Sequence, residues 1–242
     1  MRGAIFDLDG TLADTAGDLL AAANEAMAPH GLPMLDPVAD RAYAGRGARP
    51  MIRRALTLAG RPEDGAEEAR LIEAIYPALL DAYEARIASE TTLFDGAEAC
   101  LAALERAGWR IGICTNKPER LAMLLLDALG VRHRFAAVLG ADTLHVRKPD
   151  PLHFTETARR IGADPARSVM IGDTLTDLTT ARRAGVPCVL TGFGFAAEPM
   201  HELAPDAVVA HFDELPAVLE RLSPADRAAS RRAAGEGAVP AA

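Results

Sequence analysis

The sequence lacks several features that mark extracellular, membrane or metal-finger proteins. Its 242 residues include only three cysteines, Cys100, Cys114 and Cys188, and no two of them have the CxxC spacing. An odd, scattered set argues against a disulfide framework or a zinc site. Cys114 and Cys188 stand in apolar runs, which is typical of core residues in a reducing compartment. No apolar run approaches the roughly 18 residues of a membrane-spanning helix.

Positive charge is also scarce, and lysine is rarer still. The 26 basic residues are outnumbered by 34 acidic ones, the formal net charge is -8 and the isoelectric point is near 5.3. Such a balance gives no broad basic surface for nucleic acid or an anionic membrane. Lys117 and Lys148 are the only lysines. The N-terminus has the pattern of a strand and not of a signal peptide. We therefore expect a cytoplasmic protein that binds neither nucleic acid nor membrane, with its oligomeric state left open.

What is present is a change of pattern along the chain. Residues 4–6 form a short apolar run typical of a buried strand, and residues 14–90 then show only helical periodicity. We expect helices over about 14–28, 51–58 and 65–88. The apolar face of the last helix would consist of Leu71, Ile75, Leu79 and Tyr83. From Thr92 onward, expected helices at 97–107, 119–129, 151–161 and 175–184 alternate with short apolar strands at 110–114, 136–139, 168–171, 187–190 and 207–210.

This alternation predicts an α/β fold whose parallel sheet is covered by helices on both faces. The first strand needs that sheet, because an isolated strand cannot satisfy its edges. We therefore expect a Rossmann-like core of residues 1–13 and 91–222, interrupted by an all-helical insert at 14–90. Residues 223–242 are mostly Ala, Arg, Gly and Pro without periodicity, and we expect them to be disordered.

Polar side chains gather where the predicted strands end. They are Asp7 and Asp9 after the first strand, Thr115 and Asn116 after the second, Lys148 after the third, and Asp173 and Asp177 after the fourth. In an open parallel sheet, ligands bind beyond these strand ends. Clustered carboxylates repel one another unless a cation lies among them, and an all-oxygen ligand set suits magnesium. Each residue also has an ordinary structural explanation: a solvated turn, a helix cap, a loop lysine or an acidic first helical turn.

Four stretches, in this order, resemble the four motifs of the haloacid-dehalogenase-like (HAD) hydrolase superfamily. They are Asp7-Leu8-Asp9-Gly10-Thr11-Leu12, Thr115-Asn116-Lys117, Lys148-Pro149 and Gly172-Asp173-Thr174-Leu175-Thr176-Asp177. The resemblance extends over about residues 1–222, and the insert matches the helical cap of that superfamily. Within it, the stretches at 115–118 and 148–151, with Gly45-Arg46-Gly47 and Arg54-Ala55-Leu56, are most similar to phosphoglycolate phosphatases. Phe193-Gly194-Phe195 departs from the Tyr-Gly-Tyr that is frequent in those enzymes.

The resemblance implies magnesium-dependent hydrolysis of a small phosphorylated metabolite, with 2-phosphoglycolate as the first candidate. Asp7 would be the nucleophile that becomes a phosphoaspartate, and Asp9 the general acid and base. Magnesium would be bound by Asp7, the backbone carbonyl of Asp9 and Asp173, with Asp177 acting through water or orienting these ligands. Lys148, the Thr115 hydroxyl and the Asn116 backbone would hold the phosphate oxygens. In the cap, Arg46 and Gly47 would meet the substrate carboxylate.

Several alternatives share parts of this pattern. A β-phosphoglucomutase, nucleotidase or pyrophosphatase would use the same core with another cap. The dehalogenase branch lacks the second aspartate, and the phosphonatase branch needs a cap lysine, which this chain does not have. A phosphoaspartyl signalling receiver carries its reactive aspartate on the third strand and has no cap. A phosphate-binding protein without activity would have little use for the complete set of motifs.

Overall fold

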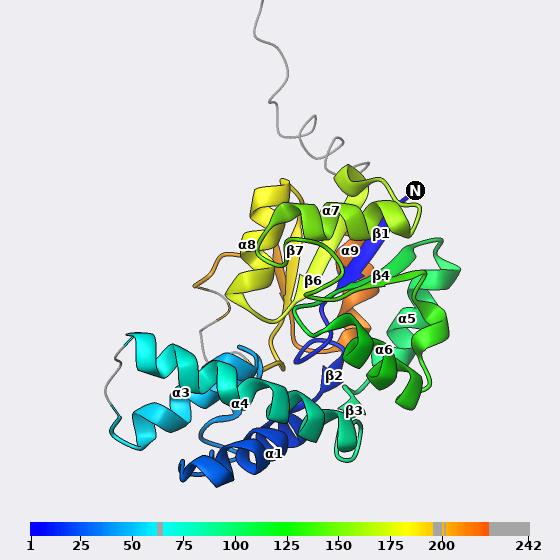
Figure 1. Cartoon of the computed structure of the whole chain (residues 1–242). Helices are drawn as coiled ribbons and strands as arrows, with labels where there is room; N and C mark the ends of the chain where they lie inside the picture. Colours follow the sequence, from blue (N-terminus) through cyan, green and yellow to red (C-terminus); the bar gives the residue numbers. More distant parts are fainter. Residues whose placement is uncertain (62–64, 196–199, 201, 223–242) are drawn as a thin grey trace, which may run out of the picture.

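A computed structural model describes residues 1–61, 65–195, 200 and 202–222 (Figure 1). Its core is a six-stranded sheet in the order β5-β4-β1-β6-β7-β8, and every pairing in it is parallel. The strands are β1 (Gly3–Phe6), β4 (Arg110–Cys114), β5 (Ala137–Leu139), β6 (Ser168–Gly172), β7 (Cys188–Thr191) and β8 (Ala207–Val209). The α/β prediction is confirmed, and the expected tail at 223–242 lies outside the described residues.

The first strand occupies the centre of the sheet. Ile5 of β1 is in register with Gly112 of β4 on one side and Met170 of β6 on the other. Every residue of β1 is buried, which explains its unbroken apolar run. The Asp7 amide extends the ladder by donating to the Ile171 carbonyl at 2.8 Å. The carboxyl ends of β1, β4 and β6 therefore meet at one edge.

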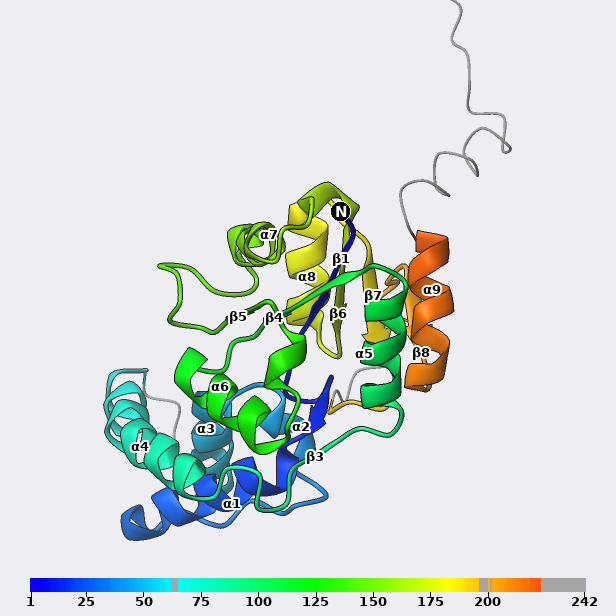
Figure 2. The ribbon, with the colours of Figure 1, turned by 90° about the vertical axis from the view of Figure 1, so that its right-hand side faces the viewer.

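Helices cover both faces of the sheet (Figure 2). Helices α5 (Ala97–Arg106), α6 (Glu119–Ala128) and α9 (Leu215–Leu222) contribute to one apolar cluster with the sheet, and α7 (Pro151–Arg160) and α8 (Leu175–Ala184) contribute to another. All three cysteines are free and buried. Short 3-10 turns complete the core at η2 (Arg132–Arg134), η3 (Pro165–Arg167) and η4 (Phe212–Glu214).

The insert forms a helical cap beside the core, with its own apolar cluster. It contains α1 (Ala16–Met27), the 3-10 turn η1 (Ala28–His30), α2 (Arg41–Ala44), α3 (Ala48–Leu58) and α4 (Gly65–Ala85). The predicted apolar face of α4 is buried at Ile75, Leu79 and Tyr83, whereas Ile72 and not Leu71 completes it. The cap cluster also includes Leu121 of α6 and Phe195, so the cap packs directly against the core.

Some short elements were not predicted from the sequence. A two-stranded antiparallel ribbon, β2 (Ala13–Asp14) and β3 (Thr92–Leu93), joins the chain where it leaves the core and where it returns. Two residues are too few to show a strand period. Helices α2 and α9 were not predicted either, because they are four and eight residues long. No helix among the described residues is long and apolar enough to cross a membrane.

Candidate active site

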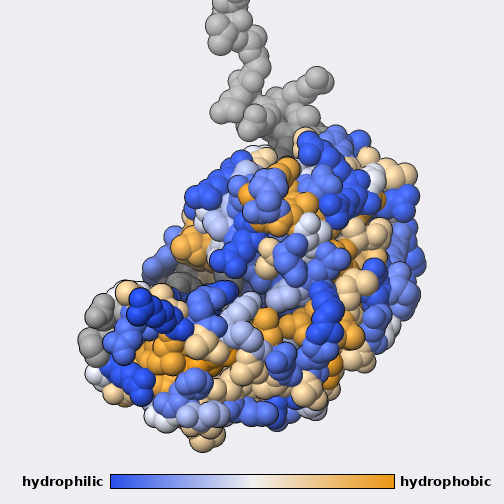
Figure 3. Space-filling view, in the orientation of Figure 1, coloured by the Kyte–Doolittle hydropathy of each residue, from blue (hydrophilic) through white to orange (hydrophobic). Residues whose placement is uncertain are grey.

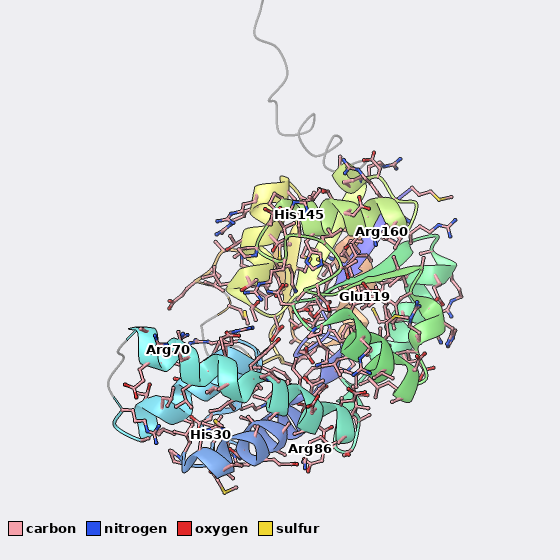
Figure 4. All side chains as sticks on the ribbon, in the orientation of Figure 1. His30, Arg70, Arg86, Glu119, His145 and Arg160 are labelled. Atoms are coloured by element: carbon pink, nitrogen blue, oxygen red, sulfur yellow. The ribbon has the colours of Figure 1, made fainter. Side chains whose placement is uncertain are left out.

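A cavity of about 570 Å³ lies between the cap and the carboxyl ends of the central strands. The surface is hollowed between these two parts of the molecule (Figure 3). The predicted site residues that line it are Asp7, Asp9, Thr115, Asn116, Lys148, Arg46 and Gly47. Basic side chains elsewhere form separate ion pairs: Arg86 lies 3.1 Å from Glu25 in the cap and Arg160 lies 2.9 Å from Glu156 in the core (Figure 4).

Lys148 links two of the predicted carboxylates. Its Nζ lies 2.9 Å from Asp7 Oδ1 and 2.7 Å from Asp177 Oδ1, and the residue is only 3% exposed. Burial alone would lower the pKa of this ammonium, but Asp177 and Asp7 outweigh that effect and the pKa is raised. Lys148 is therefore a charged, fixed group of the cavity floor and not a solvated loop lysine.

The carboxylates of Asp7, Asp173 and Asp177 form a compact acidic cluster. One oxygen from each lies within 4.8 Å of the others, and all three residues are buried. Burial raises the pKa of Asp7 to about 6, Lys148 opposes the rise and Asp177 adds to it. Burial, Asp177 and Asp7 likewise raise the pKa of Asp173 well above its usual value. Three buried carboxylates beside one ammonium carry an excess of negative charge, and their oxygens fit a hard divalent cation.

Hydrogen bonds from neighbouring groups hold Asp173 and Asp177 in place. The Thr11 hydroxyl donates to Asp173 Oδ1 at 2.9 Å, and the Phe195 amide donates to Asp173 Oδ2 at 3.0 Å. Asp177 Oδ2 accepts from the Thr174 amide and hydroxyl in a capping box that begins α8. Asp177 therefore has the helix-start role that the sequence offered, because one of its oxygens caps α8, and its other oxygen holds Lys148, a contact that was not predicted.

The loop after β4 joins this network through Asn116. Its side-chain amide donates to the Lys148 carbonyl at 3.0 Å, which fixes the lysine-bearing loop. The buried Thr115 hydroxyl accepts from the Lys117 amide at 3.2 Å, and the N-cap of the next helix is Pro118. Neither side chain therefore serves as the helix cap considered from the sequence.

Asp9 lies apart from the acidic cluster. Its Oδ1 is 2.8 Å from Lys117 Nζ, and this ammonium also lies 4.1 Å from the centroid of the Tyr83 ring in α4. Burial alone would lower the pKa of Lys117, but Asp9 and Tyr83 outweigh that effect and raise it. Sequence reasoning assigned no role to Lys117 or Tyr83. The available signal was that both lysines of the chain fall in the strand-end motifs.

On the cap side, the cavity is lined by the loop before α3. Arg46 is exposed and its guanidinium carbon lies 5.6 Å from the Tyr43 ring, while Gly47 begins α3 with a φ of 94°. Arg49 also lines the cavity and was not predicted. It lies 2.6 Å from Glu73 and 3.9 Å from the centroid of the Tyr76 ring.

Comparisons with known proteins agree with this architecture. A family model described as haloacid dehalogenase-like hydrolase matches residues 1–185. A phosphoglycolate phosphatase of Mesorhizobium japonicum is 43% identical over 219 residues, which are 90% of this chain and 95% of that protein. The phosphoglycolate phosphatase of Caulobacter vibrioides is 42% identical over 211 residues, 87% of each chain.

Solved structures of similar proteins have the same fold. A predicted phosphoglycolate phosphatase from Haemophilus somnus superimposes with a TM-score of 0.79 at 25% identity, over 89% of this chain and 96% of that one. CbbY from Rhodobacter sphaeroides, solved in complex with phosphate, gives a TM-score of 0.71 at 26% identity over 90% and 98% of the two chains. The strand-end motifs, the helical cap and these relatives together place the chain in the haloacid dehalogenase-like hydrolase family of enzymes, and within that family it is similar to phosphoglycolate phosphatases.

Proposed function

We propose that this protein is a magnesium-dependent phosphatase that hydrolyses 2-phosphoglycolate through a phosphoaspartyl intermediate on Asp7. The observation that carries the proposal is the environment of Asp7. This residue lines a capped cavity, its carboxylate lies 2.9 Å from the Lys148 ammonium, and it forms a buried cluster with the carboxylates of Asp173 and Asp177. The free, buried state of the three cysteines supports the cytoplasmic location expected from the sequence.

The acidic cluster supports a metal site. Asp7 and Asp173 would bind magnesium with their carboxylates and Asp9 with its backbone carbonyl, while Asp177 would orient these ligands and Lys148. When bound, the ion would neutralise the carboxylate and phosphate oxygens, which otherwise repel each other. Burial and the neighbouring carboxylates raise the pKa values of Asp7 and Asp173, and a bound cation would favour the ionised form of both.

The reaction would proceed in two displacements. An oxygen of Asp7 forms a bond to phosphorus as the bond to the substrate alkoxide breaks, and Asp9 gives its proton to the alkoxide. Water then attacks the phosphorus of the phosphoaspartate, and Asp9 accepts a proton from that water. The bond between Asp7 and phosphorus breaks, which releases phosphate and regenerates the Asp7 carboxylate. Lys148, the Thr115 hydroxyl and the Asn116 backbone would hold the phosphate oxygens as charge develops.

The substrate proposal rests on the relatives and on the cap. Phosphoglycolate phosphatases at 36–43% identity are among the curated proteins to which this chain is similar. Arg46 and Gly47 line the cavity opposite Asp7, where a substrate carboxylate would lie. CbbY has been solved with xylulose-1,5-bisphosphate, and a 570 Å³ cavity would admit a sugar phosphate as well. A sugar bisphosphate is therefore the second candidate.

The test is phosphate release from a panel of esters, with and without magnesium, by the natural protein and by Asp7→Asn. The panel contains 2-phosphoglycolate, sugar mono- and bisphosphates, a nucleoside monophosphate and pyrophosphate. Magnesium-dependent turnover that prefers 2-phosphoglycolate and disappears in Asp7→Asn is the expected result. A preference for another ester would overturn the substrate alone, and full activity of Asp7→Asn would overturn the mechanism.

A second experiment addresses the cap. Arg46→Ala should raise the KM for 2-phosphoglycolate much more than the KM for an uncharged aryl phosphate, because only the first has a carboxylate for the guanidinium to meet. Equal effects on the two substrates would remove Arg46 from the substrate site.

A further inference from the structure

Lys117 is the point at which the cap touches the proposed acid and base of the core. Its ammonium lies 2.8 Å from Asp9 Oδ1 and 4.1 Å from the centroid of the Tyr83 ring. Asp9 follows β1 in the core, whereas Tyr83 belongs to the last turn of α4 in the cap. Tyr83 is 1% exposed and Lys117 is 7% exposed, so both partners hold the ammonium away from solvent.

The two lysines of the chain differ in this respect. Both carboxylate partners of Lys148, Asp7 and Asp177, belong to the core, so its position is fixed within one unit. Lys117 has one partner in each unit. A buried ammonium is attracted by the negative face of an aromatic ring, and the attraction is stronger where water is excluded. The position of the Tyr83 ring therefore determines where the ammonium lies, and the ammonium determines where the Asp9 carboxylate points.

We infer that Tyr83 is a positioning residue for catalysis, which acts through Lys117 to orient the Asp9 carboxylate when the cap lies against the core. This inference rests on the proposed function, because it assumes that Asp9 is the general acid and base. Proton transfer to the leaving group and from the attacking water would both require the cap contact. Attack of Asp7 on phosphorus, with a leaving group that needs no proton, would not.

An aryl phosphate separates these steps. With p-nitrophenyl phosphate, the bond from Asp7 to phosphorus forms as the bond to nitrophenolate breaks, and this stable anion departs unprotonated. The phosphoaspartate then requires water, whose proton goes to Asp9. Tyr83→Leu should therefore release a first equivalent of nitrophenolate at about the natural rate and then turn over slowly. A misplaced reacting group can lower the rate of a reaction about a hundredfold. We therefore expect kcat to fall roughly 10- to 100-fold.

With 2-phosphoglycolate, whose alkoxide must be protonated, the same variant should lose kcat by a similar factor with little change in KM. Tyr83→Phe keeps the ring face and should restore the natural kcat. Ile75→Ala is the matched control, because it removes a buried side chain from the same helix without touching the cavity, and it should show no burst. Circular dichroism and thermal unfolding verify that each variant is folded.

A double-mutant cycle tests the route of the effect. If Tyr83 acts through Lys117, adding Tyr83→Leu to Lys117→Met should lower kcat no further. Additive losses, or a Tyr83→Leu protein with natural kcat and no burst, would overturn the inference. Failure of the proposed function is distinguishable, since the natural protein would then release no phosphate from the ester panel, or Asp7→Asn would remain active, whatever the Tyr83 variants do.

Discussion

The buried side chain of Asp7 lies beside one ammonium, that of Lys148, and in a cluster with the carboxylates of Asp173 and Asp177. Its pKa is raised to about 6 from a usual value of 3.8, chiefly by burial. A carboxyl with a raised pKa in the folded state stabilises the protein at low pH, and this contribution is lost as the pH rises through about 6. At pH 8 the ionised Asp7 of the metal-free protein therefore opposes folding.

Asp7→Asn should consequently abolish turnover and yet raise the free energy of unfolding. We expect an increase on the order of 1 kcal/mol, since one pKa unit corresponds to about 1.4 kcal/mol. Urea unfolding at pH 8 in the presence of a chelator measures it, with the exposed Asp127→Asn as a control that should change little. A less stable Asp7→Asn protein would contradict this account of the acidic cluster.

His153 of α7 makes the stability of the protein depend on pH in the opposite direction. The side chain is fully buried, and burial followed by repulsion from Lys148 lowers its pKa to about 4 from 6.5. Between these two pH values the unfolded chain binds a proton that the folded protein does not. The stability contribution of neutral His153 is therefore complete above pH 6.5 and is lost as the pH falls toward 4.

The measurement is urea unfolding of the natural protein and His153→Leu across pH 4.5–7. The difference in stability between them should change by on the order of 1 kcal/mol per pH unit in this range. Titration of Asp7 and the other acids affects both proteins and cancels in the difference. A difference independent of pH would show that folding does not change the pKa of His153.

At the scale of elements, the turn after β1 brings backbone close to the acidic cluster. Gly10 has a φ of +77°, and a Cβ there would lie 2.4 Å from Asp173 Oδ2. Gly130, after α6, has a similar φ of +73° but no atom within 4 Å of its Cβ position. Alanine substitutions at these two glycines therefore separate two effects: the strain of a left-handed backbone, which both share, and the displacement of Asp173, which only Gly10→Ala causes.

Both Gly10→Ala and Gly130→Ala should lose about 1–2 kcal/mol of stability from the left-handed backbone. Only Gly10→Ala should also lower kcat/KM, by about a hundredfold, because Asp173 must move. Chemical unfolding and steady-state kinetics at several magnesium concentrations give the two quantities. Equal activity of the two variants would mean that the turn accommodates a methyl group without moving Asp173.

At the scale of the whole molecule, the acidic cluster should couple metal binding to folding. A ligand that binds only the folded protein adds about 2.7 kcal/mol at 100 times its Kd. For a chain of this size, 1 kcal/mol shifts Tm by about 2–4 °C. Magnesium at that concentration should therefore raise Tm by roughly 5–10 °C.

Calorimetry with and without magnesium at constant ionic strength measures this shift. Asp173→Asn removes one of the three carboxylates and should lose most of the shift while remaining folded. An equal shift in both proteins would place the stabilising ion elsewhere in the molecule.

Local patterns in the sequence were enough to predict the classes of element and the edge of the sheet at which the site lies. The predicted strand at 110–114 and helix at 175–184 coincide with β4 and α8, because hydrophobic period and turn residues are local properties of the chain. The strand-end motifs follow from the same alternation, since parallel strands place their carboxyl ends together. The two-residue strand β2 and the short helix α9 were not predicted, because two residues show no strand period and eight residues span only about two helical turns.

The pairs of side chains that face one another could be identified only from the folded chain. Asp9 and Lys117 are 108 residues apart, and the ring of Tyr83 arrives from a third segment. The helical period predicted that Tyr83 belongs to a buried face, but a period identifies the face of a helix and not the group that packs on it. Asp177 likewise divides its oxygens between a local helix cap and the distant Lys148. Pair contacts of this kind depend on how the cap and the core come together, which no local pattern encodes.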